Sequence, residues 1–321
     1  MKNNNKILVT AAPHIRDTSS SKRIMLDVII ALAPAAIAGM IFFGIRAVIV
    51  VLASILSAIF AEWAFNKMTK KPDTTKDLSA VVTGLLLGMT LPSSAPIWIP
   101  IVGSIFAIVI VKQLFGGLGQ NFVNPALAAR AFLQIAYPLQ FTRYYLPLQT
   151  DVIASATPLS YLAYADFIPS TQLHLDSLFG LTAGAIGETS ALLLIIGAGY
   201  LFLRKVISWR IPVAFLTSFA AMIFVFGRHG LFSGFPLYEL LIGGLMLAVF
   251  FMATDYSSSP ITPRGKIIFG IGCGVLTAMI RAFGGYPEGA KYAILIMNLF
   301  VPLIEQYTRP RIFGTVKEGK A

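Results

Sequence analysis

The sequence predicts an all-α membrane protein with about ten transmembrane helices. Hydrophobic residues make up 56% of the 321 positions and charged residues 12%, about half of the charged fraction in typical soluble domains. The charges collect in the gaps between apolar segments of roughly 14 to 20 residues, near the length that crosses a bilayer as a helix. Helices are expected because a sheet with open edges leaves backbone groups unsatisfied in lipid.

Ten apolar segments are expected to be helical. They are 24–43, 46–66, 78–91, 97–112, 123–137, 189–203, 211–227, 237–254, 266–283 and 289–306. The third would be only about 21 Å long, shorter than a hydrocarbon core of about 30 Å. Its length and the glycine-rich turns around it indicate broken or tilted helices around an interior cavity.

The distribution of basic residues predicts the orientation of these helices. With the N-terminus in the cytoplasm, that side receives 19 of the 25 Lys and Arg residues and the other side receives five, as the positive-inside rule requires. The net charge of +11 is therefore explained by topology and anionic lipid, without nucleic-acid binding. Both termini are expected to be cytoplasmic, with the interval 138–188 outside.

Two pairs of similar motifs predict an internal repeat. "TLPSSAP" (90–96) resembles "TDYSSSP" (254–260), and "LFGGLGQN" (114–121) resembles "AFGGYPEG" (282–289), at offsets of 164 and 168. An odd number of crossings separates the copies, so two inverted five-helix units are expected. The alternative is a chance similarity of loop residues. The predicted divisions are a cytoplasmic segment (1–23), the first unit (24–137), an extracytoplasmic loop (138–188), the second unit (189–306) and a cytoplasmic tail (307–321).

Ionisable residues near the apolar segments give few functional signals. Six acidic residues lie near segment ends, where capping or interfacial hydration explains them: Asp27, Glu62, Glu188, Glu239, Asp255 and Glu305. Arg130 lies inside a segment. It either snorkels or pairs with helix-terminal carbonyls, or it holds an anionic or electron-rich ligand group. The single Cys273 and three scattered histidines predict no disulfide, iron–sulfur cluster or metal site.

Four long stretches resemble a known family. They are "APHIRDTSSSKRIMLDVIIALAP", "GLLLGMTLPSSAPIW", "KQLFGGLGQNFVNPALAARAF" and "TDYSSSPIT". In this order they resemble the D subunits of bacterial Rnf complexes, which are homologous to the B subunits of sodium-translocating NADH:quinone oxidoreductases. The resemblance implies a fold similar to urea and ammonium channels and a place in the bacterial cytoplasmic (inner) membrane. It also implies a covalently bound FMN.

The resemblance implies that FMN is attached through its phosphate to Thr157. In this family a flavin transferase recognises an Asp followed by several residues and then by Ser or Gly, Ala and Thr. The stretch "DVIASATPLS" (151–160) retains Asp151, Ser155, Ala156 and Thr157. Val152 and Ala154 depart from the residues that the family often has. The residue before a proline favours extended geometry, so Thr157 is expected to be presented outward to the transferase.

The resemblance further implies a second, noncovalent flavin, riboflavin, in the helical core. The candidate residues for its site are Asn121, Asn124 and Arg130. The expected function is an electron-transfer subunit, not catalytic alone, of a complex that couples ferredoxin:NAD electron transfer to Na⁺ or H⁺ translocation. Expected partners include the FMN-bearing G component of the complex, its A and E membrane components, the flavin transferase and membrane lipid. The alternative is a channel or transporter for a small polar solute on the same fold.

Overall fold

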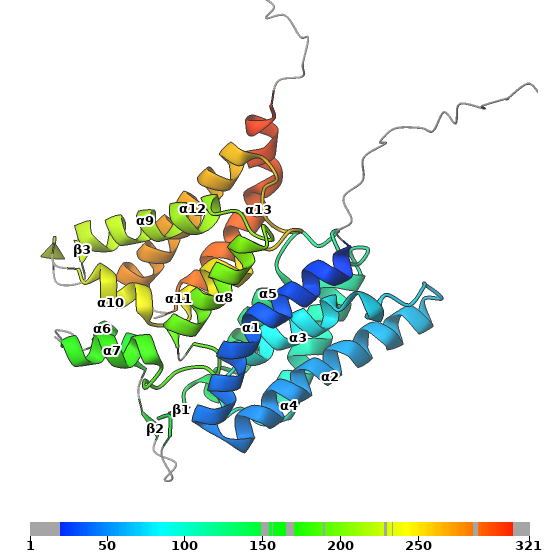
Figure 1. Ribbon diagram of the computed structural model, residues 1–321, viewed down its shortest axis with the longest axis horizontal. Coiled ribbons are helices and arrows are strands. Elements are labelled where there is room, and N and C mark those ends of the chain that lie inside the picture. The colour runs from blue at the N-terminus through cyan, green and yellow to red at the C-terminus, as the bar shows by residue number, and fades with distance from the viewer. Residues whose placement is uncertain are drawn as a thin grey trace, which may run out of the picture.

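The computed structural model describes the chain in eight stretches. They are 20–148, 154–155, 157–164, 170–188, 190–227, 230–232, 234–284 and 288–310. The described residues are mostly helical, and those of the first half lie beside those of the second half (Figure 1).

The helices of the first half follow the predicted segments closely. They are α1 (Ser21–Phe43), α2 (Ile45–Met68), the short 3₁₀ helix η1 (Thr75–Asp77), α3 (Ser79–Thr90), α4 (Trp98–Ile105), its π-helical continuation η2 (Phe106–Gln113), and α5 (Pro125–Ala136). The short third segment is confirmed, because α3 has 12 residues and no interruption.

The second half contains one interrupted helix. Its elements are α8 (Ala191–Leu203), α9 (Arg210–Val225), a two-residue hairpin of β3 (Phe226–Gly227) and β4 (Gly230–Leu231), α10 (Pro236–Leu241), α11 (Leu245–Leu247), the π-helix η4 (Ala248–Met252), α12 (Pro263–Phe283) and α13 (Ala290–Thr308). The prediction of one continuous helix over 237–254 is wrong. The chain breaks at Gly243 and Gly244, whose φ angles of +69° and +65° are left-handed and suit glycine.

The interval 138–188, predicted as a loop, contains several short elements. They are the 3₁₀ helix η3 (Pro138–Phe141), strands β1 (Tyr144–Tyr145) and β2 (Ala154–Ser155), and helices α6 (Pro158–Tyr164) and α7 (Thr171–Phe179). The two strands pair in antiparallel fashion, with Tyr144 opposite Ser155.

Side-chain caps fix the starts of several helices. Ser20, Asn124, Ser190 and Thr262 each accept a hydrogen bond from the backbone N–H three residues further on, and they begin α1, α5, α8 and α12. Pro125 and Pro263 occupy the first turns of α5 and α12, where a missing N–H costs nothing. These starts are therefore specified locally by the sequence.

Length and composition identify membrane spans among the described helices. The helices α1, α2 and α12 are each long and apolar enough to cross a membrane, and the shorter apolar helices are α3, α4 with η2, α8 and α9. In each of α1 and α2, only 33% of the most apolar 18-residue stretch is buried inside the protein. Their remaining apolar side chains, including Ile41, Leu56 and Phe60, face outward, as expected for contact with lipid.

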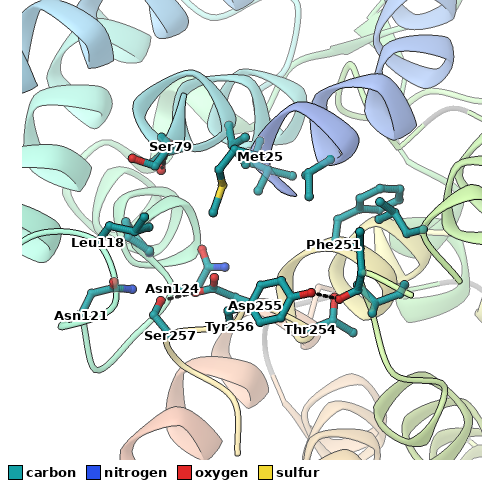
Figure 2. A pocket seen from close by; sticks show the side chains of 18 of the residues that line it. Met25, Ser79, Leu118, Asn121, Asn124, Phe251, Thr254, Asp255, Tyr256 and Ser257 are labelled. Carbon is teal, nitrogen blue, oxygen red and sulfur yellow. Dashed lines mark hydrogen bonds between the residues drawn. The ribbon is translucent and has the colours of Figure 1, made fainter. Parts of the chain in front are cut away.

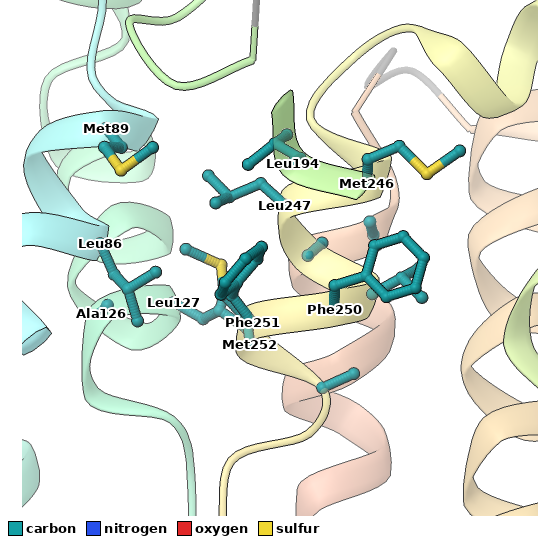
Figure 3. Close-up of a cluster of buried hydrophobic side chains, with 14 of the residues drawn as sticks. Leu86, Met89, Ala126, Leu127, Leu194, Met246, Leu247, Phe250, Phe251 and Met252 are labelled. Carbon is teal, nitrogen blue, oxygen red and sulfur yellow. The ribbon is translucent and has the colours of Figure 1, made fainter. Parts of the chain in front are cut away.

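The core lies between the two halves. Helix α1 packs against α8, α5 against α13, and α9 against α12. Figure 3 shows Leu86 and Met89 of α3 facing Leu247, Phe251 and Met252 of the interrupted helix. These side chains form a buried apolar layer toward the C-terminal end of α3.

Candidate functional site

Clefts lie at the two ends of α3. The cleft at its N-terminal end reaches Ser79, and two smaller clefts lie at its C-terminal end, one of which reaches Thr90. We call them the N-end cleft and the C-end clefts. The apolar layer of Figure 3 borders clefts at both ends, because Leu86 and Phe251 line the N-end cleft and Leu247 and Met252 line one of the C-end clefts.

The N-end cleft combines apolar walls with a polar floor. Met25 and Phe251 contribute apolar surface, and Asn121, Asn124 and Asp255 contribute polar groups (Figure 2). A wider opening shares Met25 and Asp255 with this cleft and extends to the surface between the start of α1 and the end of α13. A concave lining that is mostly apolar with a few polar groups is typical of a small-molecule site.

Hydrogen bonds hold the polar floor of the N-end cleft in place. The side-chain oxygen of Asn124 caps α5, and its Nδ2 donates to the carbonyl of Met252 at 3.2 Å. Asn121 Nδ2 donates to the carbonyl of Val123 at 3.0 Å. The hydroxyls of Ser257 and Ser258 donate to Asp255 Oδ2 at 3.0 and 2.9 Å. Asn124 therefore ties the start of α5 to the π-helix η4.

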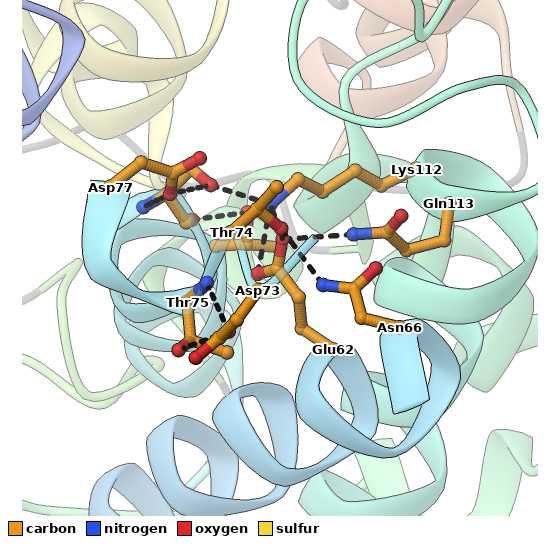
Figure 4. Close-up of polar contacts among 10 residues, drawn as sticks. Glu62, Asn66, Asp73, Thr74, Thr75, Asp77, Lys112 and Gln113 are labelled. Carbon is orange, nitrogen blue, oxygen red and sulfur yellow. Dashed lines mark hydrogen bonds and ion pairs between the residues drawn. The ribbon is translucent and has the colours of Figure 1, made fainter. Parts of the chain in front are cut away.

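A buried ion pair adjoins the same cleft (Figure 4). The Lys112 ammonium donates to both oxygens of Glu62, at 3.0 and 3.1 Å, and to the hydroxyl of Ser79 at 2.5 Å. Glu62 Oε1 also accepts from Gln113 Nε2 at 2.8 Å and from the Thr74 hydroxyl at 2.7 Å. A buried charge pair with this many hydrogen bonds satisfies both ions.

Arg130 lies beside the first C-end cleft. Its Nε donates to the carbonyl of Thr90, at the end of α3, at 2.9 Å, and its guanidinium lies 4.2 Å from the centre of the Phe141 ring. The side chain is 2% exposed and does not snorkel. Arg130 therefore pairs with a helix-terminal carbonyl, which is one of the alternatives that the sequence left open.

Glu288 connects Arg130 with the start of α13. Its Oε2 is 3.5 Å from Arg130 Nη2 and 2.5 Å from Lys291 Nζ, which also donates to Gln134 Oε1. Burial alone would raise the pKa of the Glu288 carboxyl, but the Lys291 ammonium and the Arg130 guanidinium lower it to about 2. Glu288 is therefore ionised at neutral pH.

The chain re-enters the protein before α8 and closes the C-terminal end of α3. The backbone N–H groups of Ile186 and Gly187 donate to the carbonyls of Leu91 and Met89, at 3.1 and 2.7 Å. These bonds satisfy carbonyls that a helix end leaves unpaired. The loop predicted to lie outside the membrane helices thus contributes a buried segment to the core.

Glu188, at the end of this segment, lines both C-end clefts together with Gly243 and Glu288. Its Oε2 accepts from the backbone N–H of Ala185 at 3.3 Å. Burial, together with the Glu288 carboxylate, raises the pKa of Glu188 to about 7. A Cβ atom on Gly244 would collide with Glu188 Oε1, so glycine at this position leaves the room that the carboxylate occupies.

Thr157 lines the second C-end cleft with Thr182, Glu188 and Glu288. Its Oγ1 is 2.9 Å from Ser160 Oγ and accepts from the Ser160 N–H, which caps α6. Thr157 is half-buried and lines this cleft. The Thr-Pro sequence places it at a helix start, where a hydroxyl finds a backbone donor.

The predicted site residues separate into two groups. Asn121 and Asn124 lie at the N-end cleft, whereas Arg130 lies at the first C-end cleft, so the three do not form one site. Asp151 and Ala156 lie outside the described residues, and Ser155 is described only in its backbone pairing. Thr157 and Arg130 lie at neighbouring clefts, because both clefts share Glu188 and Glu288.

The interpretation of the acidic residues as hydrated or capping groups is wrong for several of them. Glu62 and Glu239 are buried and lie against Lys112 and Arg281, and Asp27 is buried with Tyr200 and Arg204 donating to it. Sequence reasoning did not single out Lys112, Glu288 or Lys291 as site residues. Apart from the contact between Glu288 and Lys291, their partners lie far away in the chain, so the available signal was a charge at the end of an apolar segment. Within the described residues, no three metal-ligating side chains gather.

The fold defines a helical membrane protein with clefts between its helices. Residues 8–314 match the NQR2, RnfD, RnfE family. The D subunit of the Na(+)-translocating ferredoxin:NAD(+) oxidoreductase complex from Acetobacterium woodii is 50% identical, over 98% of this chain and 97% of that protein. The D subunit of the proton-translocating ferredoxin:NAD(+) oxidoreductase complex from Clostridium ljungdahlii is 40% identical, over 97% of each. The chain belongs to the NQR2, RnfD, RnfE family.

Proposed function

We propose that this chain is an electron-carrying subunit of an Rnf-type complex in the bacterial cytoplasmic membrane. In such a complex, electron transfer between ferredoxin and NAD drives the movement of Na⁺ or H⁺. The support is the near-complete match to two D subunits whose names specify this reaction, one with sodium and one with protons. Its proposed partners are the other components of the complex, including G, A and E, and a flavin transferase.

The proposed attachment residue for FMN is Thr157. Thr157 lines the second C-end cleft beside an apolar wall of Leu159, Ala183 and Leu241, which would pack against a flat, largely apolar ring at the mouth of this cleft. When bound, the flavin would supply one- and two-electron redox chemistry. The chain would supply the hydroxyl that carries it, the apolar wall, and the charged groups Glu188 and Glu288.

The N-end cleft is the proposed site of the noncovalent riboflavin. Its apolar lining fits the ring, and Asn121, Asn124, Asp255 and Ser257 offer donors and acceptors to a polar side chain. Arg130 lies at the other end of α3 and is assigned no contact with this flavin. The apolar layer between the clefts does not favour a solute channel, because Leu86, Leu127 and Met252 fill that level.

The proposed architecture is ten crossings in two inverted five-helix units, similar to urea and ammonium channels, with both termini cytoplasmic. A two-fold axis in the membrane plane would relate α1 to α8 and α5 to α13, and the helices of each pair pack against each other. Each half also holds a buried acid–base pair, Glu62–Lys112 in the first and Glu239–Arg281, 3.9 Å apart, in the second.

In-gel flavin fluorescence of the chain, coexpressed with a flavin transferase, tests the central part of this proposal. Thr157→Ala should abolish the covalent fluorescence, because a phosphoester needs the hydroxyl oxygen. Thr182→Ala is the matched control, since Thr182 lines the same cleft and should leave the fluorescence unchanged. Thr157→Ser keeps a hydroxyl and should retain part of the signal. Full fluorescence in Thr157→Ala would contradict the assignment.

A further inference from the structure

The charged groups at the C-end clefts form a balanced set. Facing Glu188 are Arg130 from α5, Tyr144 from β1, and Glu288 and Lys291 at the start of α13. Arg281 of α12 approaches the same region, where its guanidinium donates to the carbonyls of Glu239 and Ile242. With Tyr144 neutral, Arg130 and Lys291 balance the charges of Glu188 and Glu288.

The two carboxylates are held differently. Glu288 receives two cations on one oxygen, so removing its charge would leave Arg130 and Lys291 without their counter-ion. Among the hydrogen bonds described, the Glu188 carboxylate accepts one, from the backbone N–H of Ala185. Its remaining lone pairs can therefore accept a proton. Burial raises the pKa of Glu188 to about 7, so its protonation costs little near neutral pH.

An added electron beside this balanced set is costly in a poorly solvated cleft, because an unpaired charge there lacks water to stabilise it. We propose that Glu188 is the proton-accepting residue of the C-end clefts: its carboxylate takes one proton from water at the cleft mouth when an electron reaches the Thr157-linked flavin. The proton forms an O–H bond on the carboxylate and leaves again when the electron passes on. The electron comes from the reduced donor of the complex, so charge balances in both directions.

This inference rests on the proposed function, because it needs a flavin at Thr157. Geometry supports it through Glu188 itself, which lines both the cleft of Thr157 and the cleft of Arg130. The carboxylate thus shares a cleft with the proposed attachment residue and also lies among the charges of Arg130, Glu288 and Lys291. Gly244, which leaves room for Glu188 Oε1, keeps the carboxylate at this shared wall.

The test uses the full flavin-bearing chain, coexpressed with the transferase and purified in detergent. Infrared difference spectra between oxidised and reduced protein should show a protonated-carboxyl band in the parent. The midpoint potential of the covalent flavin should fall as pH rises, by up to about 59 mV per tenfold change in proton concentration for one proton per electron. Glu188→Gln should lose the band and flatten this slope.

Asp176→Asn is the control, because Asp176 lies on α7 and lines neither C-end cleft; it should keep both signals. A Glu188→Gln chain with the parental band and slope would overturn the inference. A flavin-bearing parent without any protonated-carboxyl band would overturn it too, whether or not the variant folds. A parent without covalent flavin would contradict the proposed function instead, and with it this inference.

Discussion

The Lys112 ammonium donates to both oxygens of the Glu62 carboxylate, at 3.0 and 3.1 Å, in a place where both side chains are at most 3% exposed. The two residues are fifty positions apart and join α2 to η2. The pair also forms part of the wall behind the N-end cleft, through Lys112. Its integrity should therefore affect both stability and the shape of the cleft.

Breaking this pair from one side should be costly. Lys112→Met leaves the Glu62 charge buried without its counter-ion, which typically costs about 3–5 kcal/mol. Thermal unfolding in detergent should show a lower midpoint for Lys112→Met than for Lys112→Met combined with Glu62→Gln, because the double variant removes both charges. If Lys112→Met alone were as stable as the parent, Glu62 would not depend on Lys112 as its buried counter-ion.

The helix break at Gly243 and Gly244 should not tolerate a side chain at 244. Gly244→Ala places a Cβ atom 2.4 Å from Glu188 Oε1 at a φ of +65°, and such strain costs about 1–3 kcal/mol. Gly199→Ala is the control, because a Cβ there meets nothing within 4 Å and lies inside α8. The control should be stabilised by up to about 1 kcal/mol. Equal melting midpoints for the two variants would refute the argument.

The noncovalent flavin should depend on Asn124. Asn124→Ala removes a helix cap, worth about 1 kcal/mol, and also a polar group of the N-end cleft. Ser190→Ala removes the cap of α8 but no group of that cleft. We expect acid-extractable riboflavin per covalent flavin to fall several-fold in Asn124→Ala and to stay unchanged in Ser190→Ala. Equal losses would assign the effect to helix capping alone.

The orientation can be tested with single cysteines in a Cys273→Ala background. Gln172 on α7 and Lys71 after α2 are both exposed, on opposite sides of the membrane according to the positive-inside rule. A membrane-impermeant maleimide added to intact cells should label Gln172→Cys and spare Lys71→Cys. The reverse pattern would invert the topology.

The sequence was sufficient for features that short stretches determine. Apolar segment lengths predicted where helices lie, and the short sequences Asn124-Pro125 and Thr262-Pro263 stand where α5 and α12 begin in the structure. The break at Gly243 was not predicted, because the apolar sequence continues across it. A side chain at Gly243 would collide with Leu159, which is far away in the chain, so the need for glycine there comes from a tertiary contact.

The site depends on contacts that no short stretch contains. Arg130 meets a carbonyl forty residues earlier and a carboxylate 158 residues later. Glu188 becomes a cleft residue because the chain before it turns back against α3. Sequence patterns marked Arg130 as unusual and placed Glu188 near a segment end, but only tertiary structure joins them at neighbouring clefts.

Peptide mass analysis of the purified chain, coexpressed with a flavin transferase, decides whether Thr157 carries the flavin. We predict that the peptide containing Thr157 carries the mass of FMN joined through its phosphate, with fragment ions that assign it to Thr157. An unmodified Thr157 peptide, or a flavin located on Ser155 or Ser160, would contradict it.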